Sequence, residues 1–366
     1  MKELFYRLFA FFFRASRRLK KDVDSSLVAL LSPHNASFND SLGEIEQALN
    51  EKGGYRFLHI SHKDLNGIGS ALHFFTRKAF LLARAKYVFL NDNFMPMGYL
   101  NFSEDAKVVQ LWHAEGAFKR FGLHIDQPAE VRRREIAANK RLNYVICSSP
   151  AVKEIYAGAF GVEESRVLPL GSPRADRLLK AENTAELRQR LEERYPSCKG
   201  KKTILYAPTF REDPEWDNTF LNAFDSKAFC EKTGEEYALL VRLHPQVHGE
   251  HEFPGAVDVT DYPCVNELTL VCDAVITDYS SICMDFALLD KPCFFFAPDL
   301  ERYNQTRSFY FDYRSYVPGT VCETMAELTD AIRKPDDPTV RKAFRERNLA
   351  SVDGNACERI IRAVVE

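Results

Sequence analysis

The first residue with chemistry to offer is a histidine that follows an apolar run. His113 stands in the stretch Gln110-Leu-Trp-His-Ala-Glu-Gly-Ala-Phe-Lys-Arg-Phe-Gly122, where glycines and two basic residues come after it. A neutral imidazole at the edge of a sheet can take a proton from a hydroxyl nucleophile. A histidine in this position can equally cap the strand by hydrogen bonding. His113 is therefore a candidate base, with both interpretations open.

Three strand ends in the C-terminal half carry groups that bind anions. Thr209 and Arg211 follow one apolar run, and Arg242 and His244 follow another. A third run, Val275-Ile-Thr-Asp-Tyr-Ser-Ser281, ends in two serines placed to cap the next helix. The N–H groups and dipole of a helix N-terminus form a ready site for phosphate. Alone, the serines are no more than a cap, but three such strand ends together predict a pyrophosphate site.

Two further features bear on ligands. Asp285 lies in the first turns of the helix after the serines, where its carboxylate could accept hydrogen bonds from a ribose. The histidines at 244, 248 and 251 are close in sequence, but their Pro-Gln-Val-His-Gly-Glu-His setting is typical of a loop and argues against zinc. We expect neither a metal nor a cofactor.

Parallel sheets are needed to position these side chains, and the chain alternates strand-like with helix-like stretches. Strands are predicted in two series, at 57–61, 87–91, 107–113, 144–148 and 167–170, then at 203–207, 238–243, 256–260, 274–277 and 293–297. Helices are predicted between them, among others at 70–85, 132–142, 173–194, 265–271 and 281–289. Continuous apolar strands alternating with helices indicate parallel sheets covered on both faces. We expect an α/β protein with two doubly wound, Rossmann-like domains, residues 23–196 and 197–366, after a separate segment, residues 1–22.

The N-terminal segment, MKELFYRLFAFFFRASRRLKK, has apolar residues at helical spacing among seven basic residues and one acidic residue. Its uninterrupted apolar stretch, residues 8–13, is far short of the about 20 residues that cross a bilayer. No small-residue cleavage site follows it. We expect an amphipathic helix in the membrane interface, with phenylalanines among acyl chains and arginines on anionic headgroups. The alternative is a helix that packs on the protein and shows a basic face to water.

Composition narrows the class of protein. The 366 residues are 45% hydrophobic and 28% charged, which is typical of a globular chain. A net charge of -3 argues against a nucleic-acid partner, because binding a phosphate backbone needs clustered positive charge. The nine cysteines form no CxxC pair, and several lie in apolar runs, which indicates a reducing, cytoplasmic setting.

Together these stretches resemble the CDP-glycerol glycerophosphotransferase family of wall teichoic acid synthesis, which also includes ribitol-phosphate transferases. The resemblance runs from about residue 110 to the end and rests on LWHAEGAFKRFG, ILYAPTFRED, VRLHP, VITDYSSICMDFALLDKPCFFFAPDLERY and the terminal DGNACERI. Upstream, SPHNASFNDSLGEI and FLNDNFMPM are similar to the shorter, primase-type members.

The resemblance implies a two-domain, glycosyltransferase-B-like (GT-B-like) fold with CDP-polyol held mainly by the C-terminal domain. It makes His113 and His244 the catalytic pair, with His113 as the base for the acceptor hydroxyl. The residues that it places at the donor are Thr209, Arg211, Ser280 and Ser281. Arg242 is added to the donor site from its strand end, and Asp285 is an extrapolation to the ribose or cytosine side. Many members read WHGT where this chain has Ala114 and Glu115. Glu115 would orient His113 or face solvent, and Lys119 would lie on the acceptor side.

The implied reaction is attack by a hydroxyl of an undecaprenyl-diphosphate-linked disaccharide on the phosphorus next to glycerol in CDP-glycerol, with CMP leaving. The enzyme would act as a peripheral protein on an anionic membrane surface, at the cytoplasmic face of the cell membrane. A chain close to the minimum for two domains favours priming over polymerising. The alternatives are CDP-ribitol as donor, a GT-B nucleotide-sugar glycosyltransferase, and a non-catalytic membrane-bound protein that binds a polymer.

Overall fold

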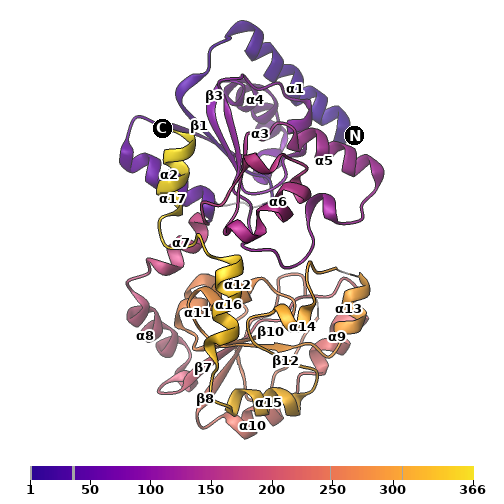
Figure 1. Cartoon of the computed structure of the whole chain (residues 1–366), viewed down its shortest axis with the longest axis vertical. Coiled ribbons are helices and arrows are strands. Elements are labelled where there is room, and N and C mark those ends of the chain that lie inside the picture. The colour runs from indigo at the N-terminus through magenta and orange to yellow at the C-terminus, as the bar shows by residue number, and fades with distance from the viewer. Residues whose placement is uncertain (1, 35–37, 248, 307) are drawn as a thin grey trace. The chain divides into compact units, whose positions relative to one another are not determined.

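The computed structural model describes residues 2–34, 38–247, 249–306 and 308–366, and it contains two parallel sheets in two compact units (Figure 1). The α/β class with two parallel sheets is as predicted. The first unit is Met1–Arg177 with Arg347–Glu366, and the second is Leu178–Glu346. These compact units differ from the predicted domain ranges in three places. The boundary lies at 177/178 instead of 196/197, the last 20 residues belong to the first unit, and the N-terminal helix is part of that unit.

The sheet of the first unit has the strand order β2-β1-β3-β4-β5-β6, and all its neighbours pair in parallel. Its strands are β1 (Asp24–Ser32), β2 (Arg56–Ser61), β3 (Ala85–Leu90), β4 (Lys107–Gln110), β5 (Tyr144–Ile146) and β6 (Val167–Leu168). The sequence analysis missed β1, although its residues 27–31 are fully buried or nearly so. This apolar run closely follows the basic N-terminal segment.

Helices cover this sheet, and one of them, the predicted helix 70–85, is interrupted. They are α1 (Lys2–Leu19), α2 (Ser41–Lys52), α3 (Ile68–His73), α4 (Ala79–Leu82), α5 (Ala129–Asn139), α6 (Lys153–Phe160) and α17 (Ala356–Val364). A π-helical turn, η2 (Phe74–Lys78), joins α3 to α4. α1 packs on this region through Phe9 and Phe13, which are completely buried. The ring of Phe9 lies 4.7 Å from that of Phe74.

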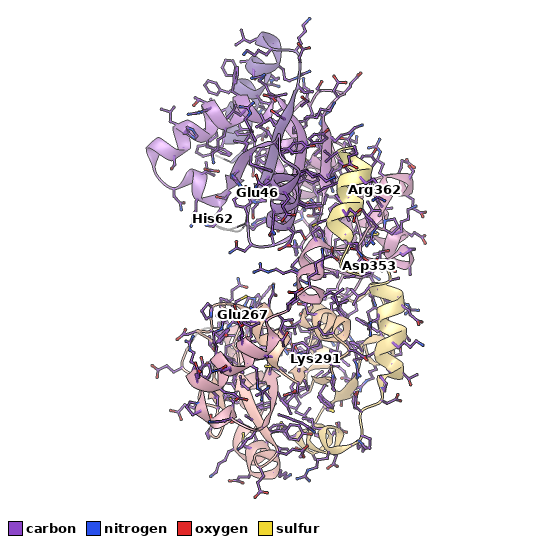
Figure 2. The ribbon with its side chains drawn as sticks, turned by 90° about the vertical axis from the view of Figure 1, so that its left-hand side faces the viewer. Glu46, His62, Glu267, Lys291, Asp353 and Arg362 are labelled. Carbon is purple, nitrogen blue, oxygen red and sulfur yellow. The ribbon has the colours of Figure 1, made fainter. Side chains whose placement is uncertain are left out.

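The last helix, α17, lies beside α2, so the C-terminal segment shares a core with the N-terminal part of the chain (Figure 1). Ile360 and Ile361 of α17 are buried against Leu42 and Ile45 of α2. Its N-terminus is capped by a carboxylate from far along the chain. The backbone N–H groups of Gly354 and Ala356 donate to Asp176 at 3.0 and 2.5 Å. Asp353 and Arg362, labelled in Figure 2, mark this C-terminal segment.

The second unit has the strand order β12-β11-β10-β7-β8-β9, again parallel throughout. Its strands are β7 (Lys202–Tyr206), β8 (Tyr237–Val241), β9 (Val257–Asp258), β10 (Ala274–Thr277), β11 (Cys293–Phe296) and β12 (Thr320–Cys322). Its helices are α8 (Thr184–Arg194), α9 (Pro214–Asn222), α10 (Ser226–Thr233), α11 (Val265–Val271), α12 (Ile282–Leu288), α13 (Leu300–Thr306), α14 (Tyr313–Tyr316) and α15 (Met325–Arg333). Two helices bridge the boundaries, α7 (Pro173–Leu179) and α16 (Pro338–Asn348).

Two half-buried cations, Arg188 and Lys291, hold helices against this second sheet. Arg188 of α8 donates to the hydroxyl of Thr203 at 3.0 Å and to the carbonyl of Val271 at 3.2 Å. Lys291, labelled in Figure 2, donates to the carbonyls of Thr269 and Cys272 at 2.8 and 2.7 Å, at the end of α11. Because these carbonyls lack helical partners, the ammonium group satisfies them.

Across the described residues, the helices are all too short or too polar to span a membrane.

Candidate active site

His113 lies just beyond β4, after a turn in which the backbone is left-handed. Trp112 has φ = 61°, which is rare for a bulky residue and marks local strain. The buried ring of Trp112 packs on Phe121 at 5.2 Å between centroids. The backbone N–H of Trp112 donates to the side-chain oxygen of Gln110 at 3.0 Å. This turn ends the strand at Gln110, three residues earlier than predicted, and leaves the His113 side chain 48% exposed.

The contacts of His113 fix the tautomer of its ring. Nδ1 lies 3.2 Å from the carbonyl oxygen of Asn91 and 3.5 Å from a carboxylate oxygen of Asp92, both just after β3. A carbonyl oxygen can only accept a hydrogen bond, so Nδ1 carries the hydrogen in the neutral ring. Nε2 then carries the lone pair, which is the form that a general base needs.

The loop that carries His113 is held by backbone hydrogen bonds to three side chains. The N–H of Gly116 donates to the hydroxyl of Ser148 at 2.8 Å, and that of Ala117 donates to the side-chain oxygen of Asn348 at 3.2 Å. The hydroxyl of Tyr156 donates to the carbonyl of Gly116 at 3.0 Å. Ser148 follows β5 and Asn348 ends α16, so the returning C-terminal chain helps to shape this loop.

Glu115 has a different place from either one predicted for it. Its buried carboxylate accepts from the hydroxyl of Ser172 at 2.6 Å and from Nε of Arg174 at 3.2 Å, and not from His113 or solvent. Burial alone raises the pKa of Glu115, but the charge and hydrogen bonds of Arg174 and the Ser172 bond outweigh it and hold the pKa below its usual range. Lys119, predicted on the acceptor side, is half-buried farther along the same loop.

In the second unit, Arg211 is buried in an ion-pair network that joins two strand ends. Its Nη1 donates to Asp278, just after β10, at 2.7 Å, and its Nε donates to Asp299 at 2.8 Å. The guanidinium is fully buried. Burial lowers the pKa of Arg211, but Asp278 and Asp299 outweigh it and raise the pKa above its ordinary value.

Thr209 belongs to the same network, because its hydroxyl donates to Asp278 at 2.7 Å. Both residues therefore have partners within the protein, and their contact with a donor stays a prediction. Arg211 donates hydrogen bonds to two carboxylates and to the carbonyl of Thr209, so it holds the ends of β7 and β10 together.

Arg242 is bonded to the protein through one nitrogen of its guanidinium. Its Nη1 donates to three backbone carbonyls after β9, those of Val259, Thr260 and Tyr262, at 3.1, 3.2 and 2.7 Å. Burial lowers the pKa of Arg242. The residue therefore ties the end of β8 to the turn that follows β9, and its contact with a donor stays a prediction.

His244, two residues farther on, has the opposite tautomer to His113. Its Nδ1 accepts the backbone N–H of Gln246 at 3.2 Å, so Nε2 carries the hydrogen in the neutral ring. The ring stacks on Phe210 at 4.7 Å between centroids. Beside it lies a pocket of about 240 Å³ lined by Phe210, Arg211, Glu212, Pro214, Asp217 and Gln246. That volume suits part of a nucleotide donor, since sites for whole ligands span roughly 300–1,000 Å³.

The two serines after β10 differ from each other. The hydroxyl oxygen of Ser280 accepts the N–H of Ile282 at 3.3 Å, whereas Ser281 makes no capping hydrogen bond with its side chain. Ser281 is exposed at the carboxyl end of the strand, where it can reach a ligand. Asp285 is 7% exposed on α12, and its contact with ribose or cytosine stays a prediction.

The histidine loop after β8 shows no metal site where it is described. Among residues 2–34, 38–247, 249–306 and 308–366, no group of three or more His, Cys, Asp or Glu side chains is arranged to hold a metal ion. His248 lies outside these residues.

Sequence reasoning missed the carboxylates that hold these sites together. Asp92 follows β3, Asp278 follows β10 and Asp299 follows β11 by three residues. The signal that was available is their place after apolar runs, since polar groups at the carboxyl ends of parallel strands meet at one edge of a sheet.

Comparison with known proteins assigns these sheets to a family. The model of the family described as CDP-Glycerol:Poly(glycerophosphate) glycerophosphotransferase matches residues 11–366. The solved structure of the wall teichoic acid polymerase TagF has the same fold, with a TM-score of 0.80 and 23% identity over 98% of this chain and 93% of that one. This likeness confirms the GT-B-like fold.

Curated relatives cover most of the chain. The teichoic acid ribitol-phosphate primase of Bacillus spizizenii strain W23 is 31% identical, over 92% of this chain and 90% of the relative. The teichoic acid glycerol-phosphate primase of the same strain is 33% identical, over 79% and 76%. By contrast, the chain spans 50% of the length of that strain's poly(ribitol-phosphate) polymerase. The chain therefore belongs to the CDP-glycerol:poly(glycerophosphate) glycerophosphotransferase family, the transferases of teichoic acid synthesis.

Proposed function

We propose that this enzyme transfers glycerol phosphate from CDP-glycerol to a hydroxyl of an undecaprenyl-diphosphate-linked disaccharide and releases CMP. The acceptor oxygen forms a bond to the phosphorus next to glycerol, and the bond from that phosphorus to the oxygen of CMP breaks. The proton of the hydroxyl passes to Nε2 of His113. The family assignment supports the donor class, and the geometry of the two histidines supports the roles.

The observation that carries this proposal is the opposite tautomers of the two histidines. His113 presents a lone pair on Nε2 because its Nδ1–H is held by the carbonyl of Asn91. His244 carries the hydrogen on Nε2 because its Nδ1 accepts the N–H of Gln246. One ring is prepared to accept a proton and the other to donate a hydrogen bond to a phosphate oxygen. A donor aimed at the charge that develops in the transition state contributes about 2.7–4 kcal/mol.

On the donor side, the second unit supplies His244 and the serines of the β10 end. Ser281 is exposed, and Ser280 is half-buried beside it. We assign these three residues to the donor phosphates. Arg211 and Arg242 support this site indirectly, because their hydrogen bonds hold the ends of β7, β8 and β10 in place.

The alternative donor is CDP-ribitol, and the similarity to a ribitol-phosphate primase over 92% of the chain favours testing it in parallel. Both primase relatives are covered over three quarters of their length or more, whereas the polymerase is covered over half. We propose the addition of a first unit over chain extension, and the number of units on the lipid product distinguishes the two.

We further propose that α1 places the enzyme on the cytoplasmic face of the membrane. Phe9 and Phe13, which were predicted to enter the acyl chains, pack inside the first unit. Leu4, Leu8 and Phe11 remain 72%, 42% and 60% exposed, on a helix with basic residues in its last turn. Exposed apolar side chains beside arginines suit an anionic membrane surface, where the lipid-linked acceptor is found.

The reaction is tested with purified enzyme, CDP-glycerol or CDP-ribitol, and a lipid-linked disaccharide, by following CMP release and the mass of the lipid product. We expect CMP and a gain of one glycerol phosphate, both lost in His113→Ala and in His244→Ala. Many added units would make the enzyme a polymerase. Turnover of a nucleotide sugar in place of both CDP-polyols would contradict the proposal.

A further inference from the structure

We propose that Asp92 is the positioning residue of the base, which holds the His113 ring and stabilises the imidazolium that forms when Nε2 takes the acceptor proton. This inference rests on the proposed role of His113. Asp92 reacts with nothing itself, and the proton stays on His113 until it is lost to solvent. The pairing of a carboxylate with the far nitrogen of a histidine base orients the ring and favours its charged form.

The geometry at Asp92 separates the tasks of its two carboxylate oxygens. Oδ2 lies 3.5 Å from Nδ1 of His113. Oδ1 accepts the backbone N–H of Asn93 at 2.6 Å, which keeps the carboxylate from rotating. Nε2 of His34 lies 3.9 Å from Oδ1. The Asp92 side chain is 22% exposed, so water screens the pair only in part.

A single buried side chain, Gln110, holds the Asp92 loop and the His113 loop in register. Its Nε2 donates to the carbonyl of Asp92 at 3.2 Å, and its oxygen accepts the N–H of Trp112 at 3.0 Å. Gln110 is 1% exposed and ends β4. The left-handed turn at Trp112 therefore places His113 beside Asp92, and the side-chain amide of Gln110 holds the backbone of both loops.

The contact is tested first without turnover, by ¹⁵N NMR of the protein labelled at its histidine rings. The His113 signals are identified by their loss in His113→Ala. We expect wild type to show hydrogen on Nδ1 in the neutral ring, and Asp92→Asn to raise the share of the Nε2–H form. Unchanged His113 signals in Asp92→Asn would overturn the inference, whether or not the enzyme uses the donors proposed.

The role is then tested by kinetics. We expect Asp92→Asn to lower kcat by about 10- to 100-fold, by analogy with the loss that follows when the carboxylate orienting a metal-bound histidine is removed. The KM for the CDP-polyol should change little, because the donor is assigned to the second unit. Asp105→Asn is the matched control, since Asp105 is exposed in the loop before β4.

A double-mutant cycle distinguishes positioning from a general loss of structure. In a His113→Ala background, Asp92→Asn should have no further effect on kcat, because Asp92 acts through the missing ring. Losses that multiply in the double variant would overturn the inference while leaving the transferase activity established. Failure of wild type to turn over either CDP-polyol would instead reject the proposed function, and the NMR result would still decide the contact.

Discussion

At the residue scale, the buried charged groups of this enzyme stabilise the fold, and the exposed polar groups are accessible to ligands. Arg211 has a fully buried side chain and is bonded to Asp278 and Asp299, whereas Ser281 and the ring of His113 are exposed. A guanidinium taken out of water is stabilised only if its partners compensate for the lost hydration.

Arg211→Met should lower the free energy of unfolding by about 3–5 kcal/mol, because the carboxylates of Asp278 and Asp299 lose the cation that compensates their charge. Urea unfolding followed by circular dichroism measures this loss. Arg190→Met, at an exposed position on α8, is the control and should stay within about 0.5 kcal/mol of wild type. Equal effects of the two substitutions would show that the network is not a source of stability.

Glu115 makes the stability of the first unit depend on acidity. Its pKa is lower in the folded protein than the ordinary 4.5, so its ionised form favours folding. The stabilisation is complete above pH 4.5 and is lost as the pH falls through the lower folded pKa. Unfolding free energies of wild type and Glu115→Gln should therefore differ most above pH 4.5 and converge below it. Glu104→Gln, exposed before β4, should show no such convergence.

At the element scale, α17 is a working part of the first sheet's core although it comes last in the chain. Ile361 is 1% exposed among residues of α2 and the sheet, while Arg362, next to it, has a side chain 69% exposed. The Asp176 carboxylate caps the helix from a segment 180 residues earlier. These contacts explain why the C-terminal residues leave the second unit.

Ile361→Ala should lower the free energy of unfolding by about 2–5 kcal/mol through the cavity it leaves. Arg362→Ala, on the outer face of the same helix, should change it by no more than about 0.5 kcal/mol. Thermal unfolding of the two variants makes the comparison. A large effect of Arg362→Ala would place α17 differently from the arrangement described.

α1 gives the element-scale prediction for the membrane. Leu8→Ser with Phe11→Ser should weaken binding to anionic vesicles by at least about tenfold, since burying the exposed part of each side chain contributes on the order of 1 kcal/mol. Co-sedimentation with vesicles measures the binding. Val340→Ser, an exposed apolar residue of α16, is the control. Equal binding of the double variant and wild type would show that α1 packs on the protein without a role at the membrane.

At the scale of the whole molecule, local patterns predicted the elements well and the partners poorly. Apolar runs identified most strands of both sheets and placed His113, His244 and the serines at strand ends. They could not show that Arg211 would be paired with carboxylates 67 and 88 residues away, because such pairings depend on the order of strands in the sheet. For the same reason the boundary predicted from sequence differs from that of the compact units, which depends on the core that the helices α8 and α17 join.

That boundary leads to the last prediction, which concerns fragments. Residues 178–346 form one continuous unit with its own core around Ile204, Leu239 and Ile276. α8 belongs to it because Arg188 is bonded to Thr203 and to the carbonyl of Val271. We expect a 178–346 fragment to be soluble, to unfold cooperatively and to be stabilised by CDP-glycerol. A 197–366 fragment, which follows the boundary predicted from sequence, lacks α8 and carries α17 without its core, so it should aggregate. Thermal unfolding with and without CDP-glycerol compares the two, and equal behaviour would reject the division of the chain at residue 178.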